Sequence, residues 1–356
     1  MSLTVIPVWS TTVTENAGWF VVMTRTYPES YEAANHTVLV SGATWRNSFG
    51  GQVSGYPFRM TDQYTFRDPS TMYSEFEPKE VSQSGPGLDS KMDDSADLGA
   101  DTYRGSGRLE GRKALITGGD SGIGAATAIA YAREGADVAI SYLPEEESDA
   151  EAIAQLITDA GRKAVKIPGD ITDAAHCRSL VETTVRELGG LDALVINAGK
   201  QQHVEQIEDL TDEEFDTTVK TNIYAMFWTV KAAIPHMPPG STIIGSSSIQ
   251  AYQPSPHLIH YAMTKASINT FFKGLAQQVA GRGIRVNVVA PGPVWTPLQT
   301  AGGQPTDALP TVGEGTPLGR WGQPAELATA YVYLASAESS FVIGETLHVN
   351  GGMPTP

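Results

Sequence analysis

The chain has 356 residues, of which 41% are hydrophobic and 18% are charged, a composition typical of globular proteins that bury a core. The formal net charge of −16 argues against a nucleic-acid or anionic-membrane partner, because such partners need a basic face, and no apolar run is long enough to span a bilayer. Its single cysteine, Cys177, cannot form an internal disulfide, which favours a reducing cytoplasm.

The first part of the chain differs in composition from the rest. In residues 1–59, polar residues and glycines are scattered among short apolar pieces, so this leader either forms a small hairpin or is a disordered or mis-assigned start. Residues 60–108 are rich in Asp, Ser, Pro and Gly and cannot bury a core of their own. We therefore expect an irregular N-terminal extension, whose second part lies as an arm on another surface, followed by one catalytic domain at 109–356.

From residue 109 onward, short apolar strands alternate with amphipathic helices. The expected strands are 113–117, 137–142, 163–167, 193–197, 242–246, 285–290 and 346–349. The expected helices are 122–134, 146–160, 174–188, 212–236, 261–281 and 324–336. This alternation predicts an α/β fold, with right-handed βαβ units that build a doubly wound parallel sheet covered by helices on both faces. Such sheets bind ligands beyond the carboxyl ends of their strands, so the residues that follow each strand are the candidates for a site.

The turn after the first expected strand is rich in glycine and reads Gly118-Gly-Asp-Ser121-Gly122-Ile123-Gly124. Gly118 would allow the sharp turn, Gly122 would let the backbone approach a pyrophosphate, and Gly124 would let the helix pack on the strand. The N-terminus of the following helix offers free N–H groups and a positive dipole end to phosphates. The spacing predicts a dinucleotide site, and an ordinary glycine-rich loop is the alternative.

The second expected strand ends at Ser141 and Tyr142. A carboxylate at this position would hold a ribose 2′-hydroxyl and repel a 2′-phosphate, and neither residue carries one. Ser141 could donate to a phosphate, although no arginine is nearby and glutamates follow shortly after in the chain. The pattern leans weakly toward NADP over NAD.

The next two strands also end in candidate cofactor residues. Asp170, followed by Ile171, could accept a hydrogen bond from an adenine amino group, or it could instead cap the next helix. Asn197, Ala198 and Gly199 are small enough to let a cofactor ribose lie close to the backbone.

A further group of residues predicts acid–base chemistry. Tyr261 and Lys265 are four residues apart, so they share one face of the expected helix, and an ammonium beside a phenol would lower the phenol's pKa from about 10. Tyr261 is therefore a candidate acid/base for a carbonyl or alcohol oxygen, which Ser248 could also bind. Asn222 is polar among apolar neighbours, and it could bend its helix and hold a water in a proton path.

Taken together, these motifs resemble the classical short-chain dehydrogenases/reductases over residues 109–353. The matching residues include the glycine turn, Asn197-Ala-Gly199, Asn222, Ser248, Tyr261-x-x-x-Lys265 and Pro291-Gly292-x-x-x-Thr296. The resemblance implies a Rossmann-type, seven-stranded parallel sheet of order 3-2-1-4-5-6-7. One departure is that the family's usual Asn-Asn-Ala-Gly has Ile196 at its first position.

The resemblance also implies a role for each matching residue. Tyr261 would be the catalytic acid/base, and Lys265 would lower its pKa and bind the nicotinamide ribose. Ser248 would orient the substrate carbonyl, and Asn222 would support a proton relay. Val294 and Thr296 would meet the nicotinamide carboxamide. The implied cofactor is NADP or NAD, with no metal.

Parts of the arm and of the glycine turn resemble a bacterial subgroup of this family, which is named for aldehyde reductases, general stress oxidoreductases or glucose/ribitol-type dehydrogenases. The subgroup implies a homotetramer that acts on a small carbonyl or alcohol, with helices 212–236 and 261–281 as the contact surfaces. A cofactor-binding protein without turnover and a 3-oxoacyl-carrier reductase remain alternatives. Candidate substrate residues are Gln201, Gln202, His203, Gln250, Tyr252 and Trp295, beside an expected mobile lid at 297–317.

Overall fold

The computed structural model describes residues 8–15, 19–26, 37–40, 62–92 and 95–355. The chain divides into two compact units, Met1–Thr61 and Asp62–Pro356. In the first unit, β1 (Val8–Glu15), β2 (Trp19–Thr26) and β3 (Thr37–Val40) form an antiparallel sheet in the order β1-β2-β3. The first two strands form the hairpin that the sequence allowed, and the leader's residues outside the three strands lie outside the described residues.

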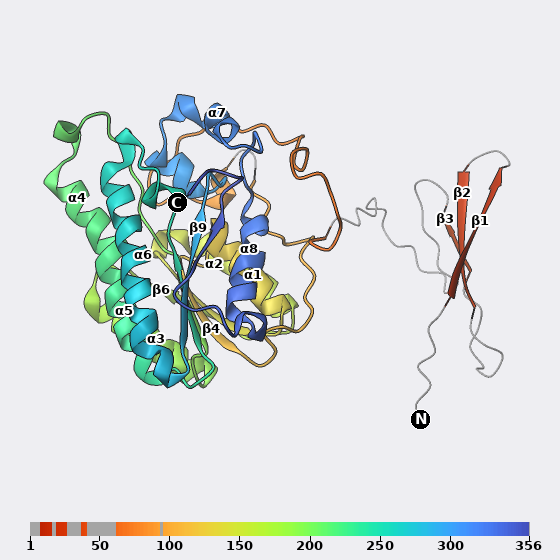
Figure 1. The fold of residues 1–356 in the computed structure, drawn as a ribbon, viewed down its shortest axis with the longest axis horizontal. Helices are drawn as coiled ribbons and strands as arrows, with labels where there is room; N and C mark the ends of the chain where they lie inside the picture. Colours follow the sequence, from red (N-terminus) through yellow and green to blue (C-terminus); the bar gives the residue numbers. More distant parts are fainter. Residues whose placement is uncertain (1–7, 16–18, 27–36, 41–61, 93–94, 356) are drawn as a thin grey trace. The chain divides into compact units, whose positions relative to one another are not determined.

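The second unit is built on a seven-stranded sheet (Figure 1). Its strands are β4 (Lys113–Thr117), β5 (Asp137–Tyr142), β6 (Ala164–Pro168), β7 (Ala193–Ile196), β8 (Thr242–Ser246), β9 (Arg285–Pro291) and β10 (Thr346–Val349). All neighbouring strands are parallel and their order is β10-β9-β8-β7-β4-β5-β6. This confirms the expected order 3-2-1-4-5-6-7, with strand ends that shift by a residue at β6, β7 and β9.

Helices cover both faces of this sheet (Figure 1). They are α1 (Gly122–Arg133), α2 (Glu147–Asp159), α3 (Ala174–Leu188), α4 (Asp212–Val219), α5 (Ala225–Ala233), α6 (Ile259–Val279), α7 (Leu309–Val312) and α8 (Pro324–Ala335). Helices α1, α2 and α8 share one apolar core, while α3, α5 and α6 share the other. Side chains alternate along a strand, so Ile116 of β4 belongs to the first core and Leu115 to the second.

Two segments differ from the sequence-based expectation. The single helix expected at 212–236 is interrupted by a π-helical turn, Lys220–Tyr224, which inserts Asn222 between α4 and α5. Insertions of this kind widen a helix locally, and the sequence indicated only a bend at Asn222. The segment after Thr296, expected as a loop that serves as a mobile lid, contains short helical turns that include Gln299–Gly303 and α7. Its Leu309 is completely buried against Trp295 and Trp321, which explains why the segment is compact.

The described residues of the arm, 62–92 and 95–108, contain one short 3₁₀ helix, Asp89–Lys91. Arg133, at the end of α1, donates to the carbonyl oxygens of Gly99 (3.0 Å) and Tyr103 (2.6 Å). Near α8, the amide of Asp97 donates to Gln323 Oε1 at 2.9 Å. The arm is therefore fastened to two helices of the same face. Within the described ranges, no helix has the length and apolar character needed to cross a membrane.

Candidate active site

The glycine turn between β4 and α1 is packed too tightly for side chains. A Cβ atom on Gly124 would lie 1.7 Å from the carbonyl oxygen of Gly118, so this position accepts only glycine. Gly118 and Gly122 have positive φ angles of 60° and 50°, a region that glycine enters without strain. The sharp turn expected at Gly118 and the close packing expected at Gly124 are present, and the turn brings backbone rather than side chains to the N-terminus of α1.

Asn197 joins this turn to the neighbouring strands. Its Nδ2 donates to the Gly118 carbonyl at 3.0 Å, and its Oδ1 accepts from Ser246 Oγ at 3.2 Å. Its backbone amide and that of Ala198 both donate to Thr117 Oγ1, at 3.0 and 3.1 Å. The glycine at 118 lets the two segments approach closely, because a Cβ on Gly118 would lie 3.0 Å from Ala198 Cα.

The expected acid–base residues converge at the carboxyl end of β8. Tyr261 and Lys265 are 5% and 4% exposed, and Lys265 Nζ lies 5.3 Å from the centroid of the Tyr261 ring. Lys265 Nζ donates to the Ser246 carbonyl at 2.9 Å, which fixes the ammonium beside the strand end. The hydroxyl of Ser248 hydrogen-bonds Tyr261 and also accepts from the amide of Gln250 at 3.1 Å.

Burial controls the protonation of this pair. It raises the pKa of Tyr261 to about 12, against the opposing effect of the hydrogen bond with Ser248. It lowers the pKa of Lys265 to about 8. The net decrease in the Tyr261 pKa that the sequence predicts is therefore not found in this structure, because burial has the largest effect on that phenol and raises its pKa. At neutral pH the phenol holds its proton.

Asn222 holds a backbone segment near this pair. Its Oδ1 accepts from the Lys200 amide at 2.7 Å, and its Nδ2 donates to the Lys200 carbonyl at 2.9 Å and to Thr264 Oγ1 at 3.0 Å. A Cβ on Gly199 would lie 3.4 Å from Asn222 Oδ1 and 3.5 Å from Lys265 Nζ, so Asn222 and Lys265 meet at this glycine. The π-helical turn places the Asn222 amide where it satisfies both backbone groups of one residue.

A cavity of about 320 Å³ lies over these residues. Of the expected site residues, it is lined by Ile123, Asn197, Ser248, Tyr261, Lys265, Pro291, Gly292, Val294 and Thr296. Of the expected substrate residues, Gln201 and Gln250 line it. The sequence interpretation missed several lining residues, among them His257, Gln299, Gln304, Trp321 and Met353. Only the composition of the chain after Thr296 pointed toward part of this set.

The other residues expected to bind the cofactor or to support the proton relay do not line the cavity. They are Gly118, Ser121, Gly122, Gly124, Ser141, Tyr142, Asp170, Ile171, Ala198, Gly199 and Asn222. The Tyr142 hydroxyl donates to Glu147 Oε2 at 2.6 Å. Asp170 is exposed and accepts from the Thr172 amide, while Asp173 caps α3, so Asp170 is not that helix cap.

The remaining substrate candidates, Gln202, His203, Tyr252 and Trp295, lie outside the lining of the cavity. Trp295 is completely buried and packs edge to face on Trp321, with ring centroids 5.5 Å apart. Tyr252 packs in the same manner on His348, with centroids 4.8 Å apart. Trp295 therefore supports a wall of the site through Trp321, which lines the cavity. Among the described residues, no group of three or more His, Cys, Asp or Glu side chains could hold a metal ion.

Comparisons with known proteins place this fold and site in a family. Residues 118–354 match the family described as Enoyl-(Acyl carrier protein) reductase. The chain is 57% identical over 286 residues to "Uncharacterized oxidoreductase YghA" of Escherichia coli, covering 80% of this chain and 97% of that protein. It is 39% identical over 280 residues to "Glucose and ribitol dehydrogenase" of Daucus carota, covering 77% and 96%.

A solved structure agrees with these sequence matches. A short-chain dehydrogenase from Burkholderia cenocepacia, crystallised in complex with NADP, has a TM-score of 0.64 and 34% identity to this chain, covering 69% of this chain and 98% of its own. The chain therefore belongs to the short-chain dehydrogenase/reductase family, a family of oxidoreductases.

Proposed function

We propose that this protein transfers a hydride between NADP or NAD and a small aldehyde, ketone, alcohol or polyol. The observation that carries the proposal is the shared cavity. It brings Ser248, Tyr261 and Lys265 together with Ile123 of the glycine turn and Thr296 beyond β9. One cavity thus combines an acid–base group with the mouth of a nucleotide turn.

The dinucleotide fits this turn, because its closely packed glycines bring backbone rather than side chains to the start of α1, where backbone amides can bind a pyrophosphate. The turn residues and Asn197 would hold the phosphates and the ribose next to them. Asp170 and Ile171 would lie near the adenine. Lys265 would bind the nicotinamide ribose, while Val294 and Thr296 would meet the carboxamide. When bound, the nicotinamide supplies or accepts the hydride.

The chain's own residues would handle the proton. With its pKa raised to about 12 by burial, Tyr261 holds a proton at neutral pH and can donate it to a carbonyl oxygen as hydride arrives at the carbon. Ser248, bonded to Tyr261, would position the same oxygen. In the direction of alcohol oxidation, a charged Lys265 would favour the phenolate that accepts the proton. Asn222 fixes Lys200 and supports the route by which that proton reaches solvent.

Substitution of Tyr261 tests this proposal. Tyr261→Phe removes the hydroxyl and keeps the ring, so turnover is expected to fall by about 10²-fold or more, with dinucleotide affinity nearly unchanged. Tyr333→Phe on α8 is the matched control and should retain activity, because Tyr333 does not line the cavity. Near-normal turnover of the Tyr261 variant would contradict the assignment.

The cavity lining favours a small polar substrate. Gln201, Gln250 and His257 offer hydrogen bonds, while Leu298 and Trp321 offer apolar contact, a mixture that suits a polyol, a sugar or a small aldehyde. The carrot relative's name points the same way. The matched family's description favours a carrier-bound acyl substrate as a second candidate, but a net charge of −16 disfavours docking of an acidic carrier protein. An assay panel of aldehydes, sugars and acyl thioesters with NADH and NADPH separates them.

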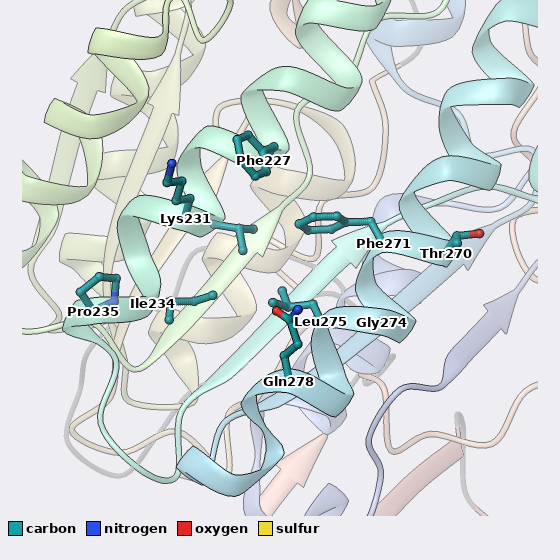
Figure 2. A pocket seen from close by; sticks show the side chains of 10 residues that line it. Phe227, Lys231, Ile234, Pro235, Thr270, Phe271, Gly274, Leu275 and Gln278 are labelled. Atoms are coloured by element: carbon teal, nitrogen blue, oxygen red, sulfur yellow. The ribbon is translucent and has the colours of Figure 1, made fainter.

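We also propose that the protein is a cytoplasmic homotetramer that contacts its copies through α5 and α6. A hollow of about 500 Å³ lies between these helices, with Phe227 and Phe271 at its upper rim and Leu275 and Ile234 within it (Figure 2). Phe227 of α5 and Met263 of α6 are each 43% exposed, which is costly for large apolar side chains in water. Light scattering that gives a monomer mass at micromolar concentration would rule this assembly out.

A further inference from the structure

The arm reaches the cofactor turn through one carboxylate. Asp89 begins the 3₁₀ helix Asp89–Lys91, and its Oδ2 accepts a hydrogen bond from the Gly122 amide at 2.8 Å. Gly122 is the first residue of α1, so this amide is one of the unpaired donors at the positive end of the helix. The side chain thus occupies a donor that the proposed function assigns to the dinucleotide's pyrophosphate.

Three further contacts hold Asp89 in this place. Its own amide donates to Asp149 Oδ2 of α2 at 2.7 Å. Six residues earlier, Gln83 donates from its amide to the Thr300 carbonyl at 2.9 Å and from Nε2 to Thr300 Oγ1 at 3.1 Å. A Cβ on Gly87 would lie 2.7 Å from the Pro297 carbonyl oxygen. The arm therefore crosses from the segment after Thr296 to the turn and to α2.

The surroundings of Asp89 are unfavourable for a negative charge. Its Oδ1 is buried and has no hydrogen-bond partner in the described part of the chain, and the same is true of Asp120 Oδ2 in the turn. Asp120 is only 1% exposed. Burial raises the pKa of Asp89 to about 6; the Gly122 amide opposes this rise, and the charge of Asp149 adds to it. Burial likewise raises the pKa of Asp120 and of Glu146, which interact with each other.

We propose that Asp89 is a residue of the dinucleotide site that competes with the cofactor pyrophosphate for the N-terminus of α1. The inference rests on the proposed function, because it assumes that the turn binds a dinucleotide. A carboxylate and a pyrophosphate are both anions that seek the same amides and the same helix dipole, and each repels the other. The arm thereby sets how tightly the protein binds its cofactor.

The test compares two asparagine substitutions in the arm. Asp89→Asn keeps the shape and an acceptor oxygen for Gly122 but removes the charge. Asp97→Asn is the matched control, because among the described residues the Asp97 carboxylate accepts from the Tyr73 hydroxyl and the Gly99 amide, both within the arm. The Kd values of NADH and NADPH are measured from their fluorescence at pH 7.5 in low salt with a chelator. The apparent melting temperature Tm of each variant verifies that it is folded.

Asp89→Asn is expected to bind both dinucleotides about tenfold more tightly than the wild type, because one like-charge contact is removed. Asp97→Asn should remain within about twofold of the wild type. Unchanged or weaker binding by a folded Asp89→Asn variant would overturn the inference. If the wild type binds neither dinucleotide, the proposed function itself fails, so the two failures are distinguishable.

The pH dependence gives a second, independent result. As pH falls from 7.5 to 5, Asp89 becomes protonated and loses its charge. The difference in dinucleotide Kd between the wild type and Asp89→Asn should therefore disappear. Asp149 accepts from the Asp89 amide, and its charge acts on Asp120 and Glu146; all three carboxyl groups are present in both proteins, so the comparison isolates the charge at position 89. A difference in Kd that is equally large at pH 5 and pH 7.5 would show that the charge of Asp89 does not weaken dinucleotide binding.

Discussion

Arg108 of the arm donates two hydrogen bonds to Glu134 at the end of α1, from Nη2 at 2.7 Å and from Nε at 3.0 Å, both to the carboxylate oxygen Oε1. The Tyr103 hydroxyl donates to this oxygen as well, at 2.7 Å. The amides of Ser106 and Arg108 donate to the other oxygen, Oε2, at 2.9 and 3.0 Å. The Glu134 side chain is completely buried, so its charge is balanced almost entirely by the arm.

Glu134→Gln is expected to lower the free energy of unfolding by about 2 kcal/mol at pH 7, because charge-assisted hydrogen bonds are lost. Although burial opposes it, the bonds from Arg108 and Tyr103 lower the pKa of Glu134 to about 2, from a usual 4.5. A lowered carboxyl pKa stabilises the fold above pH 4.5, and this contribution disappears as pH falls toward 2. Urea unfolding of the wild type and of Glu134→Gln from pH 7 to pH 3 measures this contribution. If the difference in their free energies of unfolding does not decrease as the pH falls, the prediction is contradicted.

Lys265→Met should raise the Tm by a few degrees at pH 7 while turnover is lost. Burial lowers the pKa of Lys265 to about 8 from 10.5, which corresponds to about 3 kcal/mol against the charged form in the folded protein. For a basic group with a lowered pKa, this penalty is complete below pH 8 and disappears by pH 10.5, so the gain in Tm should shrink as pH rises. Lys273→Met, on the exposed side of α6, should change neither quantity. A lower Tm for the Lys265 variant at pH 7 would refute the prediction.

Gly124→Ala should both destabilise the protein and weaken dinucleotide binding. The new methyl group would lie 1.7 Å from the Gly118 carbonyl oxygen and 2.7 Å from Asn197 Nδ2, so the turn must open. Overpacking of this kind costs about 1–3 kcal/mol. Gly281→Ala is the control, since a Cβ there meets nothing within 4 Å. Thermal unfolding measures the stability of the two variants, and NADH titration measures their affinity for the dinucleotide. Equal Tm and Kd values for the two variants would mean that the turn tolerates a side chain at position 124.

Removal of residues 1–59 should leave Tm and activity unchanged. The chain divides between residues 61 and 62, and the arm that follows carries its own bonds to α1 and α8. A second truncation that starts at Leu109 also removes the arm, including Arg108, and should lower the Tm. Loss of folding or turnover in the shorter deletion would make the leader an integral part of the enzyme.

The sequence predicts what depends on local patterns. The order of the strands, the glycine turn and the neighbourhood of Ser248, Tyr261 and Lys265 follow from periodicity, spacing and family resemblance. Other features could not be predicted this way. The contact of Asp89 with Gly122 joins residues 33 apart through an irregular arm, which no periodicity encodes. The raised pKa of Tyr261 was missed because spacing reveals a neighbouring lysine but not the depth of burial.

The long-range attachments of the arm affect the order in which parts of the chain can fold during synthesis. Gln83 bonds to Thr300, 217 residues later, and Asp97 bonds to Gln323, 226 residues later. The arm leaves the ribosome before either partner exists, so these two attachments cannot form until nearly the whole sheet has been made. Closing such long intervals is slow compared with forming local helices. Attachment of the arm to Thr300 and to Gln323 is therefore a late folding event, whereas its bonds to α1 and α2 can form as soon as those helices exist.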